Sequence, residues 1–244
     1  MNQKKAALLI IGDELLVGRV RDENLSFLSY ELSKLGIKVT QARFISDNKQ
    51  EIIKNIQELY PSVDYLLLTG GIGPTHDDVT TEAVSEAFNL KYELHSQAYQ
   101  ILEDYYKSAN KPFLEGSKKM AYLPANAELL YNKLTYAPGF KINKLFVFPG
   151  VPFITKQIFI DNKHLFESGL PICSKSLIVD IPESKLALEL RNFQNLYHNL
   201  SIGSYPKLND NGSWITELVV TSNNLELLDK CFKDLINLIN TLKG

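Results

Sequence analysis

Three glycines and a group of oxygen-bearing side chains follow one another in one short stretch, Thr69-Gly-Gly-Ile-Gly-Pro-Thr-His-Asp-Asp-Val-Thr80. The glycines Gly70, Gly71 and Gly73 allow the backbone to take positive φ and to approach a ligand closely. A turn of this kind directs backbone N–H groups into a concave nest, and a helix that starts after it adds positive potential. The chemistry that this pattern favours is the binding of a phosphate.

Carboxylates stand directly beside this predicted phosphate nest. Asp77 and Asp78 follow the glycines, in the company of Thr75, His76 and Thr80. Because a carboxylate repels a phosphate unless a cation lies between them, the pattern predicts metal-assisted chemistry at a phosphorus centre. The stretch matches neither the G-x-G-x-x-G fingerprint of dinucleotide-binding folds nor the G-K-[ST] of a P-loop.

Two further acids follow other predicted strands. Asp13 comes shortly after the apolar run 6–11, and Asp47 follows the alternating run 37–43. Each acid taken alone is explained by turn formation or helix capping. In a parallel sheet, however, the carboxyl ends of the strands meet at one edge. Asp13, Asp47 and Asp78 together are then better explained by a cation, or by a sugar hydroxyl that needs acceptors.

The elements that must position these residues are those of an α/β domain. Continuous apolar runs predict buried strands at 6–11, 64–68 and 145–148. Apolar spacing predicts helices over 24–35, 51–59, 81–88, 95–110 and 153–166. Thr80 is the expected N-cap of the third helix. The rigid turn Pro149-Gly-Val-Pro152 is expected to expose the backbone N–H of Gly150.

The composition changes at a predicted linker, residues 167–171, and a different order of elements follows. Strands are expected at 175–181, 201–205 and 214–221, and helices at 183–199 and 225–242. Asn211-Gly212 is typical of a hairpin turn between two of these strands. The sequence thus predicts two domains. Residues 1–168 form a three-layer αβα domain with a mostly parallel sheet, and residues 172–244 form a small α+β domain.

The pattern Thr-Gly-Gly-x-Gly-Pro-Thr-x-x-Asp-x-Thr resembles the signature of the molybdopterin-binding (molybdenum cofactor biosynthesis) domain superfamily. The version with Ile72 and His76-Asp-Asp78 is most similar to one branch, which contains the N-terminal half of the competence/damage-inducible protein CinA and the N-terminal domain of eukaryotic FAD synthase. Other segments resemble this branch in the same order: Gly12-Asp-Glu-Leu15, Asn24, Ala137-Pro-Gly-Phe140 and Pro149-Gly-Val-Pro152. Thr135-Tyr136 departs from the Gly-Thr usual in CinA, which leaves the preferred base or ring open.

The resemblance implies a protein that binds a small nucleotide or pterin and assembles as a homodimer or homotrimer. Three functions remain open. The first is a divalent-metal-dependent pyrophosphatase that splits ADP-ribose or FAD. The second is molybdopterin binding with adenylyl transfer, and the third is a non-catalytic nucleotide-binding module. The second domain favours the first function, and the clustered acids argue against the third.

Residue roles follow from the first function. The expected substrate-binding residues are Gly70, Gly71, Gly73, Thr75, Thr80, Asn24, Gly150 and Lys119. The expected metal ligands for Mg²⁺, Mn²⁺ or Co²⁺ are Asp78 with Asp13 or Asp47. The expected catalytic residues are Asp78, Asp77 and Asp47, with Asp77 or His76 positioning the attacking water. Asn24 is also explained as a helix cap, and Lys119 as an exposed lysine. A methyl group at Gly71 is expected to weaken nucleotide affinity more than stability.

The composition bounds the classes of partner. The chain has 244 residues, 45% of them hydrophobic, which is enough for one large domain and a small one. A net charge of −2 gives no bulk attraction to nucleic acid, and no apolar run approaches the ~20 residues of a membrane span. No export signal is recognised, and Cys173 and Cys231 lack metal-ligand spacing, so we expect a cytoplasmic protein with reduced thiols. We expect neither the nicotinamide-mononucleotide deamidase domain of CinA nor the adenylyltransferase domain of FAD synthase within these residues.

Overall fold

The computed structural model describes residues 3–132, 134–167 and 169–243. These residues form two compact units. The first comprises the described residues up to Leu32 together with Ile37–Glu167, and the second comprises Ser33–Gly36 with the described residues that follow position 168. Ser168 of the predicted linker lies outside the described residues. Each unit has a hydrophobic core of its own.

The first unit is built on a six-stranded sheet with the strand order β2-β1-β3-β8-β7-β6. The neighbours β2, β1, β3 and β8 are parallel, whereas β7 and β6 are antiparallel additions at one side. The strands are Lys5–Ile11 (β1), Lys38–Ile45 (β2), Tyr65–Thr69 (β3), Glu128–Leu130 (β6), Gly139–Ile142 (β7) and Leu145–Phe148 (β8). The predicted mostly parallel sheet is therefore confirmed.

Helices cover both faces of this sheet, because its central strands are apolar on both sides. On one face, Leu9 and Leu68 share a core with the apolar residues of α3 and α4. On the other face, Phe148 packs against Phe159 of α7, which meets Phe27 of α2. The helices are Asp13–Leu16 (α1), Asn24–Lys34 (α2), Lys49–Leu59 (α3), Thr80–Ala87 (α4) and Pro152–Asp161 (α7), with 3-10 turns at Tyr60–Ser62 and Lys163–Leu165. The predicted three-layer arrangement is confirmed.

The strand order creates a switch point between β1 and β3, because the chain goes from β1 to one side and returns to the other. The register sets Ile10 beside Thr69 and Thr69 beside Phe148, while Ile11 pairs with Ile45 on β2. The segments that follow the four parallel strands therefore leave the sheet at the same edge. Open α/β sheets bind ligands at this edge, outside a switch point.

A side excursion of the chain carries two more helices of the first unit. It is closed by the antiparallel pair β4 (Tyr92–Leu94) and β5 (Tyr122–Pro124) and contains α5 (Ser96–Ser108) and α6 (Glu115–Lys119). His95 caps α5, since its Nδ1 accepts the N–H of Ala98 at 3.2 Å. The helix predicted from residue 95 thus begins one residue later.

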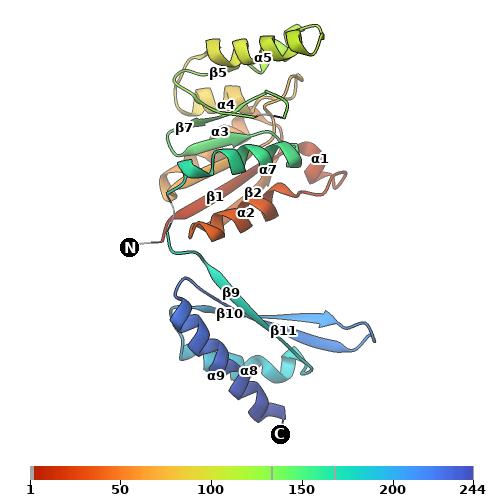
Figure 1. Cartoon of the computed structure of the whole chain (residues 1–244), viewed down its shortest axis with the longest axis vertical. Helices are drawn as coiled ribbons and strands as arrows, with labels where there is room; N and C mark the ends of the chain where they lie inside the picture. Colours follow the sequence, from red (N-terminus) through yellow and green to blue (C-terminus); the bar gives the residue numbers. More distant parts are fainter. Residues whose placement is uncertain (1–2, 133, 168, 244) are drawn as a thin grey trace. The chain divides into compact units, whose positions relative to one another are not determined.

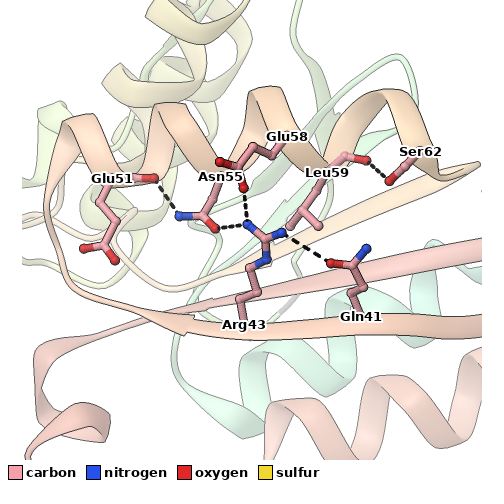
Figure 2. A network of polar contacts seen from close by, with 7 residues as sticks. All are labelled: Gln41, Arg43, Glu51, Asn55, Glu58, Leu59 and Ser62. Atoms are coloured by element: carbon pink, nitrogen blue, oxygen red, sulfur yellow. Dashed lines mark hydrogen bonds and ion pairs between the residues drawn. The ribbon is translucent and has the colours of Figure 1, made fainter.

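Arg43 ties the edge strand β2 to α3 (Figure 2). Its guanidinium donates to Asn55 Oδ1 at 2.7 Å and to Glu58 Oε2 at 2.6 Å, both on α3. At the start of the same helix, the side chain of Asn48 accepts two backbone N–H groups. The short connection between β2 and α3 is therefore anchored, and this connection carries Asp47.

The second unit is a three-stranded antiparallel sheet in the order β10-β11-β9, with α8 and α9 against one face (Figure 1). Its elements are Cys173–Val179 (β9), Glu183–Asn195 (α8), Ser201–Leu208 (β10), Trp214–Ser222 (β11) and Leu225–Lys243 (α9). Leu218 and Val220 of the central strand share the core with Leu228 and Leu235 of α9. The predicted small α+β fold is confirmed. No helix in the described ranges is long and apolar enough to cross a membrane.

Candidate functional site

A cavity of about 650 Å³ opens at the carboxyl edge of the parallel strands. Such a volume lies within the range of small-molecule sites. One part of its lining comes from the glycine loop, which we define as residues 70–78 and of which all residues except His76 line the cavity. Another part is the aromatic wall, defined as Tyr105, Tyr106, Met120 and Thr135. The remaining lining residues are Ile11, Gly12, Glu14, Val20, Asp47, Ala137, Pro138, Pro149, Gly150, Val151, Pro152 and Ile154.

Glycine is required at two positions of the glycine loop. Gly70 has φ +102°, and a Cβ on it would lie 2.1 Å from the carbonyl oxygen of Ile11. Gly71 has φ +66°, and a Cβ there would lie 2.2 Å from Thr80 Oγ1. The predicted positive φ is thus confirmed at these two residues. It is wrong for Gly73, where a Cβ would lie 2.7 Å from Asp78 Oδ2, the end of a side chain.

The backbone N–H groups of the loop divide into used and available donors. The N–H of Gly70 donates to Phe148 at 3.1 Å, within the sheet, and so cannot hold a phosphate. Within the described residues, the N–H groups of Gly71, Ile72 and Gly73 meet no acceptor. Gly70 therefore cannot contribute its N–H to the predicted phosphate nest, and the N–H groups of the next three residues have no protein acceptor in the described ranges.

Thr80 does not cap α4, contrary to the prediction. The helix begins at Thr80 itself, and the residue before it is Val79. The N–H of Thr80 donates to the carbonyl of Gly71 at 2.9 Å, and its side chain is fully buried with no partner for Oγ1. Thr80 thus packs beneath the glycine loop and does not line the cavity.

Asp78 closes the glycine loop on itself. Its Oδ2 accepts the N–H of Thr75 at 2.8 Å and the Thr75 hydroxyl at 2.5 Å. The pKa of Asp77 is also lowered, first by the Thr75 side chain and then by the backbone N–H of Asp77, with smaller attractions from His76 and Lys119; because the Thr75 hydroxyl has a single proton, it serves either Asp77 or Asp78 at one time. Asp77 is therefore readily ionised at neutral pH, while Asp78 is engaged in holding the loop.

Asp47 lies in the opposite electrostatic situation. Burial raises the pKa of its carboxyl, and repulsion by Asp13, Glu14 and Asp77 raises it further, while the N–H of Asp13, donated to Asp47 Oδ2 at 2.9 Å, opposes the shift. Glu14 lines the cavity, whereas Asp13 does not. The acids near the cavity are thus Asp47, Asp77 and Glu14, in addition to Asp78.

No three His, Cys, Asp or Glu side chains in the described part of the chain are arranged so that they could hold a metal ion. The predicted set of Asp13, Asp47 and Asp78 consequently does not form a closed metal site. Asp13 presents its backbone N–H to Asp47, and Asp78 is turned to Thr75. The convergence of strand ends brings the acids to one edge without bringing these three carboxylates together.

Asn24 connects the start of α2 to the Pro-Gly-Val-Pro turn. Its Nδ2 donates to the carbonyl of Gly150 at 2.8 Å, and the side chain is buried. Capping of α2 is the task of Asp22, whose Oδ2 accepts the N–H of Leu25 at 2.9 Å, so the alternative role of Asn24 as a helix cap is wrong. A Cβ on Gly150 would lie 3.4 Å from Gly70 Cα, so this turn approaches the glycine loop.

Buried polar atoms without a partner gather around these strand ends. Four such side-chain atoms occur in the described residues, and three of them belong to Asn24, Thr69 and Thr80. Unsatisfied groups are rare in folded proteins, and functional sites are one place where they are retained.

Lys119 and His76 lie on the other side of the glycine loop. The ammonium group of Lys119 donates to the carbonyl of Thr75. Both Lys119 and His76 line a second cavity of about 380 Å³, and neither lines the first. The positions expected for a phosphate counter-ion and a water-positioning imidazole are therefore not in the larger cavity.

Neither Tyr105 nor Tyr106 of the aromatic wall was predicted as a site residue, whereas the turn at Thr135 was singled out from the sequence. The pattern Tyr99, Leu102, Tyr106 predicts a core-facing stripe, and Leu102 is indeed fully buried. Tyr105 and Tyr106, however, line the cavity. Two adjacent tyrosines cannot both lie on one narrow apolar stripe, and this was the available signal.

Comparison with known proteins shows which families the two parts of the chain resemble. A family model described as probable molybdopterin binding domain matches residues 7–162, and one described as FAD synthase, middle domain, matches residues 171–243. The CinA-like protein of Flavobacterium psychrophilum is 37% identical over 205 residues, and a relative from Clostridioides difficile is 32% identical over 211 residues. These alignments cover 78% and 83% of the chain, respectively, but 48% and 50% of the relatives, so the chain spans about half the length of the curated relatives it matches.

Among solved structures, the CinA protein of Thermoplasma acidophilum, described as having unknown function, is similar in fold. It aligns with a TM-score of 0.61 and 25% identity. The alignment covers 67% of this chain and 98% of that protein. The resemblance predicted from the sequence is confirmed by these matches.

Proposed function

The chain belongs to the family of probable molybdopterin-binding domains, with CinA-like relatives, and from this we propose that it is a divalent-metal-dependent pyrophosphatase acting on a nucleotide such as ADP-ribose or FAD. The observation that carries the proposal is one cavity lined by both the available N–H donors of the glycine loop and the carboxylates of Asp47 and Asp77. A diphosphate requires donors for its oxygens, and its cleavage requires acids that handle protons and cations.

The chain's own residues would share the work as follows. The N–H groups of Gly71, Ile72 and Gly73 bind oxygens of the diphosphate. Asp47, whose pKa is raised, accepts the proton of an attacking water, while Asp77 stays ionised. Environments that push two carboxyl pKa values apart are typical of acid–base pairs. The water oxygen forms a bond to one phosphorus, and the bridging P–O bond breaks, with AMP as one product.

A divalent cation fits these residues only when the ligand contributes oxygens as well. Mg²⁺ is usually held by one or two carboxylates together with substrate phosphates, so a closed cluster of three side chains is not required. Repulsion of Asp47 by Asp13, Glu14 and Asp77 is the kind of strain that a bound cation relieves. Asp77 would hold the ion together with oxygens of the diphosphate, which leaves Asp47 to accept the proton. When bound, it would neutralise charge that develops on the phosphoryl oxygens.

Two other functions are tested beside this one. The description of the first family model favours binding of a molybdopterin with adenylyl transfer, whereas the match of the second unit to the middle domain of FAD synthase favours a flavin or adenine nucleotide as the ligand. A non-catalytic nucleotide-binding module is disfavoured, because carboxylates beside an anion nest weaken passive phosphate binding.

The experiment is a product analysis on the purified protein. ADP-ribose, FAD, and ATP with molybdopterin are each incubated with Mg²⁺, Mn²⁺ or Co²⁺, and products are separated by chromatography. We expect AMP with ribose 5-phosphate or with FMN, and no product after chelation. Product from ATP and molybdopterin alone would establish adenylyl transfer instead, and tight nucleotide binding without turnover would establish the binding module. Light scattering on the same sample tests the expected homodimer or homotrimer.

A further inference from the structure

Tyr136 has a backbone conformation that its residue type rarely adopts. Five non-glycine residues in the described ranges have positive φ, and four of them are asparagines. The fifth is Tyr136, at φ +62°. Asparagine tolerates the left-handed region, whereas a bulky side chain there is strained and persists only when its surroundings hold it.

Two interactions hold Tyr136 in this conformation. Its ring stacks on Tyr105, with centroids 4.9 Å apart and 23° between the planes. The turn around it is organised by the buried Asn132, whose Nδ2 donates to Thr135 Oγ1 at 2.6 Å and to the carbonyl of Ala137 at 3.1 Å. Oδ1 of the same Asn132 accepts the N–H of Leu134 at 2.8 Å. The strained turn is thus fixed from both sides.

The stacked rings of Tyr105 and Tyr136 are not part of the buried core. The side chain of Tyr136 is 44% exposed, and Tyr105 is only half-buried. Tyr105 nevertheless lines the cavity, and its orientation is fixed by an edge contact with Tyr106 at 5.4 Å. Tyr106 in turn stacks on Phe113 at 5.2 Å. The structure therefore maintains a partly exposed aromatic surface, held by ring contacts, beside the glycine loop.

We propose that Tyr105, backed by Tyr136, is a stacking plate for a planar heteroaromatic ring of the ligand, and that Tyr136 is a specificity-determining positioning residue. The inference rests on the proposed function, since it assumes that the glycine loop takes the phosphates of the same ligand. A nucleobase, a flavin or a pterin each presents a π-face of the required kind. In this proposal the heteroaromatic ring of the ligand stacks on Tyr105, and its phosphates bind the backbone N–H groups of the glycine loop.

The test compares two probes by calorimetric titration: ADP-ribose, which carries a ring, and inorganic pyrophosphate, which does not. Tyr105→Leu should weaken ADP-ribose binding about tenfold and change pyrophosphate binding by less than about twofold, because stacking of one base on an aromatic ring typically contributes this much affinity. Tyr105→Phe, which keeps the ring, should bind both probes like the wild type. Tyr136→Asn suits the backbone and should weaken ADP-ribose binding about threefold without lowering the melting temperature.

The results that would contradict the stacking plate differ from those that would contradict the proposed pyrophosphatase. Equal losses for both probes in Tyr105→Leu would show that the tyrosine supports the phosphate site or the fold, and no loss for ADP-ribose would remove the plate. Failure of the wild type to bind ADP-ribose at all would overturn the plate together with the proposed substrate. Binding of ADP-ribose without cleavage would count against the pyrophosphatase alone, because the titration does not depend on turnover.

Discussion

The glycine loop and the aromatic wall line the same cavity but are built in different ways. The glycine loop is a run of consecutive residues whose shape is set by backbone constraints at Gly70 and Gly71. The aromatic wall is assembled from α5, from the residue after α6 and from the turn that contains Thr135. The first offers N–H groups and carboxylates, and the second offers ring faces.

The difference teaches where each kind of substitution will act. In the glycine loop, Gly70 and Gly71 lie against other atoms of the protein, so an added methyl group would clash with the protein and not with a ligand. In the aromatic wall the side chains are partly exposed, so their loss is expected to affect the ligand more than the fold. Substitutions in the glycine loop and in the aromatic wall test this difference between stability and ligand binding. The largest effect on stability is expected at Gly70.

Gly70→Ala should destabilise the first unit by about 3 kcal/mol or more, because the new Cβ meets a backbone carbonyl that cannot move away from the sheet. Gly18→Ala is the matched control. Gly18 also has a positive φ, at +71° against +102° for Gly70, but a Cβ on it would meet nothing within 4 Å. The control should cost only about 1 kcal/mol. Chemical denaturation of both variants measures the difference, and equal costs would mean that the loop relaxes around the methyl group.

Asp47→Asn should lower turnover of the proposed pyrophosphatase by about 100-fold while leaving the melting temperature unchanged or slightly raised. Asparagine keeps an acceptor for the N–H of Asp13 and removes a carboxylate that burial and three acids disfavour. Ionised Asp47 opposes folding, since its pKa in the folded state is raised, and removal of its charge does not cost stability.

Asp64→Asn is the matched control for Asp47→Asn. Asp64 stands before β3, at the opposite end of that strand from the glycine loop, and accepts the N–H of Lys5 at 2.8 Å. This hydrogen bond is the main cause of its lowered pKa, so its charge favours folding at neutral pH. The control should lose some stability and no turnover. A loss of turnover in both variants would mean that the assay reports folding.

The sequence is sufficient for those parts of the fold and site that depend on neighbouring residues. The apolar runs predict the parallel strands, and the predicted Leu145–Phe148 strand is found with the same bounds. Positive φ at Gly70 and Gly71 is also predictable, because a tight turn directly after a buried strand needs backbone conformations that glycine adopts most easily. The sequence also predicts that Asp13, Asp47 and Asp78 come to one edge of the sheet, because the carboxyl ends of parallel strands lie at the same edge whatever their side chains are.

Features that depend on distant contacts are not predictable in the same way. Thr80 has the residue type of an N-cap, but its N–H is taken by Gly71 and its side chain is buried beneath the loop. Glu14 lines the cavity and its neighbour Asp13 does not. Which of the two faces the cavity depends on how the short helix after β1 is rotated, and the sequence does not define that rotation. The pair of Tyr105 and Tyr136 joins residues thirty-one positions apart (136 minus 105), and only the folded chain brings them together.

Gly71→Ala should cost about 2 kcal/mol of stability, which reverses the expectation drawn from the sequence that affinity would suffer more. The reason is that the added methyl group is directed at Thr80 Oγ1 inside the protein. Combination with Thr80→Ala should recover about 1 kcal/mol, because it removes the atom that the methyl group meets. Denaturation of the two single variants and the double variant measures this coupling. Normal stability with a large loss of pyrophosphate affinity would instead favour the expectation from the sequence.

The smallest effect is expected at Lys119. Lys119→Met should change the affinity for pyrophosphate by less than about twofold, since the ammonium group donates to Thr75 and lines the second cavity. Stability should fall by about 1 kcal/mol or less, the usual net contribution of one exposed hydrogen bond, and Lys119→Arg should retain most of it. Titration with pyrophosphate and thermal melting of both variants provide the check. A tenfold loss of affinity at unchanged stability would mean that Lys119 leaves Thr75 when the anion binds. The ligand would then be bound by three kinds of group: the backbone N–H groups of the glycine loop, the rings of the aromatic wall and the ammonium group of Lys119.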